Sequence, residues 1–179
     1  MIFQAESQPA ESNSELAGQV EAIFGPGGLL SHAKNFEHRL PQQGMAVAVI
    51  GALEAGQNLV AEAGTGVGKS LAYLIPAILY GQAHAKKAII ATHTINLQEQ
   101  LAEKDLPMLQ RILPVDFSFT MLKGRANYLC TRRLQRALAR ADGLFTSPEV
   151  AELKRVHEWS RTTEDGSLSD FDVEPDTRC

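Results

Sequence analysis

The chain is poor in cysteine and has no long hydrophobic run. Two cysteines, Cys130 and Cys179, occur among 179 residues, which is too few for the disulfide framework of a small secreted protein. No apolar run approaches the roughly 20 residues that cross a bilayer. The first 33 residues hold no Lys or Arg, whereas a secretory signal starts with positive charge. These absences predict a cytoplasmic protein without a membrane partner.

The chain also lacks a strong overall charge. Its net charge of -4 supplies no global field that would draw the protein to nucleic acid. The charges are nevertheless segregated, because residues 117–141 hold six Lys/Arg and no acid, while residues 164–176 hold six acids and no base. This pattern predicts a local anion-binding surface and a separate solvated acidic segment.

Length and composition limit the number of domains. With 44% hydrophobic residues among 179, the chain can bury the core of one domain, but two full domains would not fit comfortably. Residues 1–30 are polar and are interrupted by the sequence GPGG at 25–28. We therefore expect a loosely ordered polar segment at the start of the chain.

Residues 63–70 form the most informative motif. Their sequence AGTGVGKS fits the phosphate-loop pattern G-x-x-x-x-G-K-S/T, with Ala63 in place of the first glycine. Glycines allow the N–H groups of residues 64–69 to turn inward around a phosphate chain. Lys69 would add a positive charge, and the Ser70 hydroxyl would bind Mg²⁺. The motif predicts that the chain binds a nucleoside triphosphate, with catalytic roles for Lys69 and Ser70.

The alternative for this motif is a glycine-rich turn before a lysine at a helix start. The flanking sequence favours the phosphate loop, because a short apolar segment at 58–62 and an apolar helix at 71–79 place the motif between strand and helix. The residues predicted to hold the nucleotide are Ala63, Gly64, Thr65, Gly66, Val67, Gly68, Lys69 and Ser70.

Hydrophobic periodicity predicts an alternating order of elements around the motif. A helix is expected from Pro41 to near Gly56. It is followed by strands at 58–62, 87–92 and 117–122 and by helices at 71–79 and 96–109. This β-α-β-α-β order is typical of a parallel sheet that binds its ligands at the C-terminal ends of the strands.

Two further predictions concern the helices. In the helix at 96–109, Leu97, Leu101 and Leu106 are expected to face inward, and Pro107 to weaken the end. Later in the chain, helices are expected at 130–141 and 148–159.

Four blocks in the same order resemble the DinG/XPD family of superfamily 2 iron-sulfur DNA helicases. They are residues 39–46 (RLPQQGMA), 62–70 (EAGTGVGKS), 91–101 (ATHTINLQEQL) and 123–130 (KGRANYLC). The resemblance implies an α/β fold, in which an incomplete RecA-like P-loop NTPase domain precedes the start of an iron-sulfur cluster domain. The expected boundaries are 1–30 for the polar segment, 31–122 for the ATP-binding domain and 123–179 for the start of the cluster insertion.

The resemblance also assigns roles to residues outside the phosphate loop. It implies that Gln42 contacts the adenine base of ATP, with Gln43 as the competing choice. Thr92, His93 and Thr94 resemble the family's contact with single-stranded DNA, although Thr94 would serve as an ordinary helix N-cap in either case.

The basic stretch after residue 122 is expected to contact nucleic acid. Lys123 and Arg125 would neutralise phosphates, Asn127 would donate hydrogen bonds and Tyr128 would stack on a base. A solvated basic helix face is the usual alternative, and contacts to the backbone alone leave RNA as an alternative to DNA.

The resemblance also implies a metal site at the cysteines. Cys130 occupies the position of the family's first ligand to a 4Fe-4S cluster, whereas a lone cysteine on a helix is more often a small buried hydrophobe. Cys179 would be a second ligand or a nearby residue. Two cysteines cannot complete a four-thiolate site, so residues beyond this chain would be required.

The function implied by the resemblance is ATP-driven movement along single-stranded DNA, 5' to 3', with unwinding of forked or duplex DNA in repair or replication. No Asp-Glu-x-His motif follows a strand, so we expect the chain to be the N-terminal portion of a longer helicase and to be inactive alone. The alternatives are a non-catalytic ATP-binding module that switches a protein partner and a small-molecule kinase.

Overall fold

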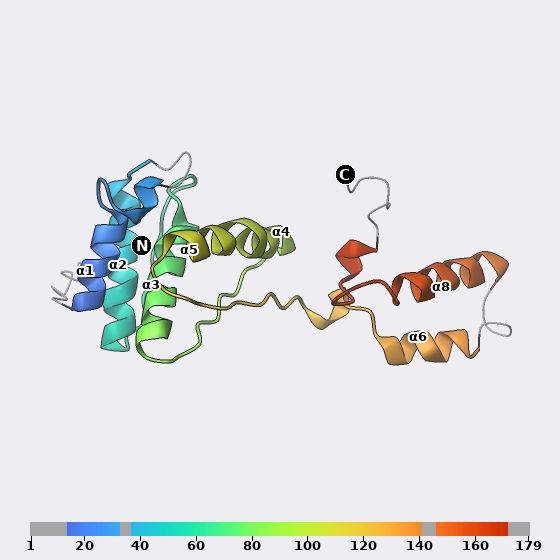
Figure 1. The fold of residues 1–179 in the computed structure, drawn as a ribbon. Coiled ribbons are helices and arrows are strands. Elements are labelled where there is room, and N and C mark those ends of the chain that lie inside the picture. The colour runs from blue at the N-terminus through green and yellow to red at the C-terminus, as the bar shows by residue number, and fades with distance from the viewer. Residues whose placement is uncertain (1–13, 33–36, 141–145, 172–179) are drawn as a thin grey trace, which may run out of the picture. The chain divides into compact units, whose positions relative to one another are not determined.

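The computed structural model describes residues 14–32, 37–140 and 146–171 (Figure 1). The chain divides into two compact units, Met1–Met121 and Leu122–Cys179. None of the helices within the described ranges has the length and apolar character that a bilayer crossing requires.

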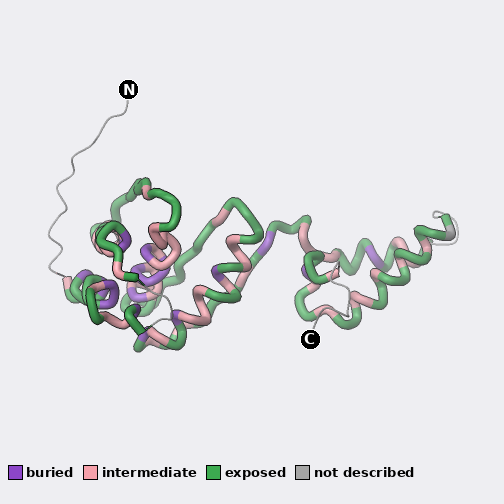
Figure 2. The backbone as a smooth tube through the Cα atoms, turned by 90° about the horizontal axis from the view of Figure 1, so that it is seen from above, coloured by how far each residue is buried: buried purple, intermediate pink, exposed green. Residues whose placement is uncertain are grey.

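Three helices form the centre of the first unit. They are α1 (Glu15–Phe24), α2 (Leu40–Ala55) and α3 (Lys69–Ala83), and α2 packs against both of the others. Their buried side chains recur at helical spacing and form one hydrophobic core (Figure 2). The largest fully buried ones include Phe24 of α1, Ile50 of α2 and Ile75 of α3.

Helix α1 lies within the polar segment at 1–30, for which the sequence predicted a loosely ordered start and no helix. Val20 and Phe24 are buried in the core, and the 3_10 turn η1 (Leu29–His32) adds buried Leu30. Ser14 caps the helix by accepting a hydrogen bond from the N–H of Ala17 at 3.0 Å. Because residues 1–30 are polar when taken together, their composition did not indicate this helix. The remainder of the predicted segment, residues 1–13, lies outside the described residues.

Helix α2 has the limits that the sequence predicts. Pro41 lies in its first turn, and Gly56 ends it in the left-handed conformation with φ of 62°. Helix α3 begins at Lys69, two residues earlier than predicted, and continues to Ala83 through Pro76. The first turns of both helices therefore border the phosphate loop.

A longer helical run follows in three pieces, which are α4 (Ile95–Gln100), the π-helical turn η2 (Leu101–Asp105) and α5 (Leu106–Ile112). In the π-helical turn, the N–H of Leu106 donates to the carbonyl of Leu101, five residues earlier. Pro107 has no N–H to continue the α-helical ladder. The wider turn therefore lets the run pass the proline. Leu101 is buried and Leu97 and Leu106 pack against the core, which confirms the predicted inward face.

The predicted parallel sheet is not shown by the structure. No strand is assigned anywhere in the described residues, and segments 58–62, 87–92 and 117–122 are connecting segments. A parallel sheet buries its apolar side chains under helices on both faces, but Val60 is 97% exposed and Ile89 is 92% exposed. These segments have the apolar composition of buried strands, but among the described residues they do not pair with other strands.

The described residues of the second unit form two helices and two short 3_10 turns. Helix α6 (Thr131–Leu138) packs against α8 (Ser147–Trp159), and both confirm predicted helices. Thr146 and Glu149 form a reciprocal capping box at the start of α8. The 3_10 turns are η3 (Arg125–Asn127) and η4 (Leu168–Asp170). An isolated antiparallel bridge between Tyr128 and Ser167 joins the two ends of this unit.

Candidate functional site

The phosphate loop depends on two glycines with left-handed backbone. Gly66 has φ of 79° and Gly68 has φ of 84°, a conformation that other residues adopt only with strain. Gly68 is also the N-cap of α3. The two residues turn the chain directly into the first helical residue, Lys69, as the motif predicts.

The N–H groups of the loop are available to an anion. Among the described residues, none of the N–H groups from Gly64 to Gly68 donates a hydrogen bond within the chain. The N-terminus of α3, a helix of 15 residues, contributes its partial positive charge at the same place. Free donors beside a helix N-terminus form an arrangement that binds phosphate.

The Lys69 side chain folds back over the loop. Its Nζ donates to the carbonyl of Ala63 at 2.9 Å and to that of Gly64 at 2.7 Å. An ammonium has three donors, and it would exchange these carbonyls for phosphate oxygens when a nucleotide enters.

Gln42 and Gln43 point to different parts of the first unit. Gln42 is 3% exposed, and its Nε2 donates to the carbonyl of Gly68 at 2.8 Å. Gln43 instead donates to the carbonyl of Glu21 in α1 at 3.3 Å and pairs with the His38 ring. Gln42 is thus the one of the two that contacts the loop, while its contact with adenine stays a prediction.

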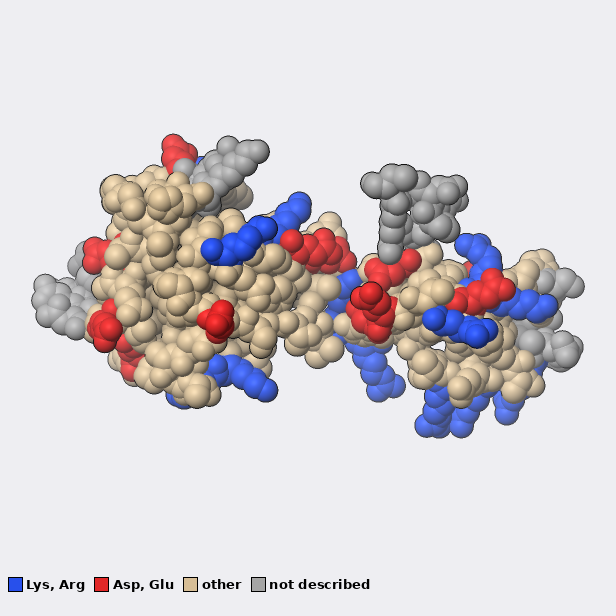
Figure 3. Space-filling model, viewed as in Figure 1, with Lys and Arg blue, Asp and Glu red and all other residues tan. Residues whose placement is uncertain are grey.

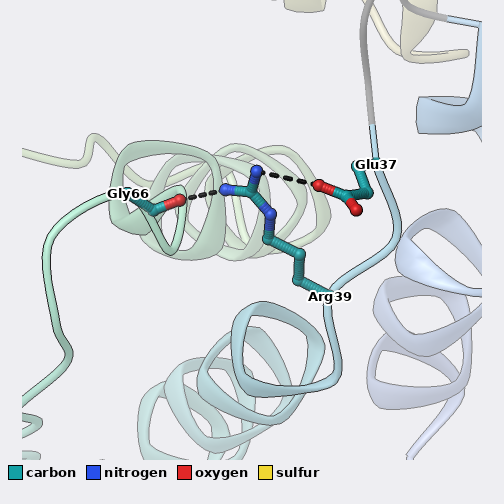
Figure 4. Close-up of polar contacts among 3 residues, drawn as sticks. All are labelled: Glu37, Arg39 and Gly66. Atoms are coloured by element: carbon teal, nitrogen blue, oxygen red, sulfur yellow. Dashed lines mark hydrogen bonds and ion pairs between the residues drawn. The ribbon is translucent and has the colours of Figure 1, made fainter.

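Arg39 also contacts the loop, and the sequence analysis assigned it no role. Figure 4 shows its guanidinium between two partners: one nitrogen donates to the carbonyl of Gly66, and the other lies 3.1 Å from the Glu37 carboxylate. In the sequence, Arg39 could have been identified as a site residue only from its position three residues before Gln42.

A cavity of about 510 Å³ lies beside the loop. This volume is within the range of small-molecule sites. The cavity joins the start of α2 to the first half of the loop, and its lining residues are Pro41, Met45, Ala61, Glu62, Ala63, Gly64 and Val67.

Ser70 can supply one metal ligand. It lies in the first turn of α3, and its hydroxyl makes no hydrogen bond within the described part of the chain. No group of three or more His, Cys, Asp or Glu converges in that part either. A single hydroxyl in this position fits Mg²⁺ carried by the phosphates of a nucleotide, because Mg²⁺ at such sites takes few protein ligands.

Residues 92–94 form a local turn before α4. The Thr94 hydroxyl accepts from the N–H of Leu97 at 3.3 Å as an N-cap, and the Thr92 hydroxyl donates to the carbonyl of Thr94 at 3.0 Å. His93 is exposed. No hydrogen bond links this turn to the phosphate loop within the described residues.

Lys123, one of the four predicted nucleic-acid contacts of the second unit, is buried. It is 6% exposed, and its Nζ donates to the hydroxyls of Ser167 at 3.0 Å and Ser169 at 2.7 Å. Its backbone N–H donates to the Tyr128 hydroxyl at 2.9 Å. Lys123 therefore joins the two ends of this unit.

The other two predicted contacts differ in exposure and partners. The Asn127 amide donates to the carbonyl of Gly124 at 3.1 Å, which holds it in the η3 turn. Arg125 keeps an exposed side chain. Of the predicted basic contacts, Arg125 is therefore open to solvent and Lys123 is not.

Helix α6 separates a basic face from a buried one. Leu134 is buried, whereas Arg132, Arg133 and Arg136 are exposed. None of these arginines is in an ion pair within the described residues. Figure 3 shows Lys and Arg side chains gathered over this helix. The sequence predicted this concentration of positive charge, and the structure places it on α6.

Cys130 is exposed at the N-cap of α6. Its pKa is lowered, first by a hydrogen bond from the backbone N–H of Arg133 and then by the N–H of Arg132 and the charges of Arg133 and Arg125. A lowered pKa favours the thiolate, which is the form that binds metals. The structure thus does not place Cys130 among buried hydrophobes.

The cysteines of this chain do not fit a complete 4Fe-4S site. The sequence holds two of them, and Cys179 lies outside the described residues. A cluster of this type takes four thiolates, so this chain supplies at most half of the ligands.

Comparison with known proteins gives consistent matches. Residues 41–165 match the DEAD/DEAH box helicase family. The ATP-dependent DNA helicase YoaA of Haemophilus influenzae is 42% identical over 154 residues, which cover 85% of this chain and 23% of that protein. The protein of the same name from Escherichia coli is 45% identical over 148 residues, which cover 82% and 22%.

A third relative has a different name. The ATP-dependent helicase DinG of Mycobacterium tuberculosis is 40% identical over 149 residues, which cover 74% of this chain and 22% of that protein. The chain spans less than a quarter of the length of each of these three relatives.

Proposed function

Because the chain belongs to the DEAD/DEAH box helicase family, we propose that it is the nucleotide-binding part of an ATP-dependent DNA helicase. The helicase match implies a RecA-like fold. We assign nucleotide binding to the first unit and the start of an iron-sulfur cluster insertion to the second, with the boundary at residue 122.

The observation that carries the proposal is the phosphate loop, in which the N–H groups of residues 64–68 have no hydrogen-bond acceptor among the described residues. Upon ATP binding, Lys69 would leave the carbonyls of Ala63 and Gly64 for the β- and γ-phosphates, and Ser70 would join Mg²⁺. The Gln42 amide uses Nε2 on Gly68, which leaves its Oε1 to accept from the adenine amino group.

The DNA-binding part of the proposal is supported by charge and by the names of the relatives, which include ATP-dependent DNA helicases. The exposed arginines of α6 and Arg125 would neutralise phosphates without reading bases, and residues 92–94 would add hydroxyl and backbone contacts. We assign single-stranded and forked or duplex DNA as the partner, 5'–3' movement, a role in repair or replication, and the cytoplasm as the location.

We also propose Cys130 as the first ligand of a 4Fe-4S cluster in the complete protein. Its exposure and its lowered pKa support this role. Cys179 would be a second ligand, with the other thiolates supplied from outside this chain.

The test is hydrolysis of ATP by the complete protein that carries this chain, with and without single-stranded DNA. Lys69→Ala should lower DNA-stimulated hydrolysis by on the order of a hundredfold or more, because it removes a charge that stabilises the transferring phosphoryl group. Lys87→Ala is the matched control, since Lys87 is exposed and outside the site, and it should hydrolyse ATP like the wild type.

Two results would contradict the proposal. Undiminished turnover in Lys69→Ala would remove the loop from the ATP site. Nucleotide binding that depends on Lys69, without any hydrolysis stimulated by DNA, would instead favour the nucleotide-controlled switch.

A further inference from the structure

We propose that Arg39 is a positioning residue that holds the tip of the phosphate loop in its nucleotide-binding shape. The inference rests on the proposed ATP-binding function and adds a residue to that site. Its basis is the guanidinium of Arg39, which donates to the carbonyl of Gly66 at the left-handed turn of the loop (Figure 4).

The carbonyl groups of the loop are held by side chains of two kinds. The Lys69 ammonium donates to the carbonyls of Ala63 and Gly64. These hydrogen bonds must break when the ammonium moves to phosphate. Arg39 holds Gly66 and Gln42 holds Gly68, and neither donor is needed by the phosphates. After the lysine has moved, Arg39 and Gln42 would still hold the peptide planes of Gly66 and Gly68 in place.

Both donors come from the start of α2. Arg39 is its N-cap residue and Gln42 lies in its first turn, with Pro41 between them. Proline fixes φ near −65° and stiffens this turn, so the two side chains extend from a rigid base. Fixing a flexible loop before binding lowers the entropy lost when the ligand arrives.

The contact needs the forked shape of arginine. One terminal nitrogen reaches Gly66 and the other reaches Glu37, and a guanidinium can do this because its donors diverge in one plane. The ion pair with Glu37 is exposed on both sides, at 44% and 75%, so it contributes orientation more than stability. Lysine could reach one partner but would not be oriented by the other.

The test measures the affinity of the 179-residue chain for a fluorescent ATP analogue with Mg²⁺. Arg39→Ala should weaken binding by about five- to tenfold, the effect of one partly exposed charged hydrogen bond. Millimolar methylguanidinium should restore most of the loss, whereas the same concentration of sodium chloride should not. Arg39→Lys should lose less than Arg39→Ala. The control Arg111→Ala, at an exposed arginine of α5 outside the site, should stay within about twofold of the wild type.

A second measurement follows the loop without nucleotide. The backbone order parameter of Gly66 by NMR should fall toward the flexible range, below about 0.6, in Arg39→Ala but not in Arg111→Ala. An unchanged order parameter, wild-type affinity in Arg39→Ala, or a loss that methylguanidinium fails to restore would overturn the proposal. Failure of the wild-type chain to bind nucleotide would instead count against the proposed function, and the order parameter would still decide the role of Arg39.

Discussion

Single residues of the phosphate loop have little room to vary, and Gly68 has the least. A Cβ at this position would lie 2.2 Å from Nε2 of Gln42, and φ is 84°. Gly68→Ala should therefore displace the buried Gln42 amide and strain the backbone by about 1–2 kcal/mol. We expect nucleotide affinity to fall more than tenfold, by the conversion of roughly 1.4 kcal/mol per tenfold, as measured by titration calorimetry.

Gly44 provides the matched control for this substitution. It lies within α2 with open space around its Cα, and its φ is not positive. Gly44→Ala should leave nucleotide affinity unchanged and raise stability slightly, because alanine favours a helix over glycine by roughly 1 kcal/mol. Wild-type affinity in Gly68→Ala would show that the loop does not need its left-handed turn.

The sequence predicted the loop better than its surroundings. Lys69 and Ser70 follow from a local motif whose spacing is fixed by chemistry. Arg39 could not be assigned in this way, because its contact with Gly66 spans 27 residues and depends on how α2 meets the loop. Lys123 has the composition of a surface charge, but two serines more than 40 residues later enclose it.

At the scale of elements, the π-helical turn before α5 contains an unfavourable carboxylate. Partial burial raises the pKa of Asp105, against smaller lowering effects of the Gln100 hydrogen bond and the Lys104 charge. The ionised side chain therefore destabilises the folded state at neutral pH. Asp105→Asn should raise the melting temperature there, by on the order of 1 °C because the site is partly exposed.

The stability gain of Asp105→Asn should depend on pH. The destabilisation by ionised Asp105 is fully present above the raised pKa that this group has in the folded state. It is absent below the ordinary value of 3.8. The advantage of Asp105→Asn should thus disappear as the pH falls through that interval, as followed by circular dichroism. A gain that persists at low pH would point to altered hydrogen bonding instead of charge.

Helices could be predicted from the sequence more completely than strands. Helix α2 and helix α8 have apolar spacing and end signals within their own residues, so local reading was sufficient. Helix α1 was not predicted because residues 1–30 were judged together as a polar segment, although the helix itself buries four side chains. The segments at 58–62 and 87–92 were predicted as strands, but strand formation needs a partner that local sequence does not specify.

At the scale of the whole molecule, the single tryptophan allows the two units to be followed separately. Trp159 lies in the second unit, against Phe171 with ring centroids 5.3 Å apart. Phe24 lies in the core of the first unit and is 1% exposed. Phe24→Ala should destabilise the first unit by about 3–5 kcal/mol through loss of buried area and creation of a cavity.

Two spectroscopic signals check this expectation. The helical signal of the first unit, by circular dichroism, should melt at lower temperature in Phe24→Ala, while the fluorescence transition of Trp159 should stay near its wild-type midpoint. The opposite substitution, Phe171→Ala, should change the tryptophan transition and leave the first unit stable. Coincident shifts of both signals in both variants would show that the units unfold as one.

The exposed apolar segments of the first unit have a consequence for how the chain behaves in the cell. Val60 and Ile89 project almost fully into solvent, and short β-prone stretches of this kind promote aggregation when unprotected. Lys86 directly precedes the second stretch, Lys87 begins it, and Glu62 ends the first. These charges act as gatekeepers that oppose self-association.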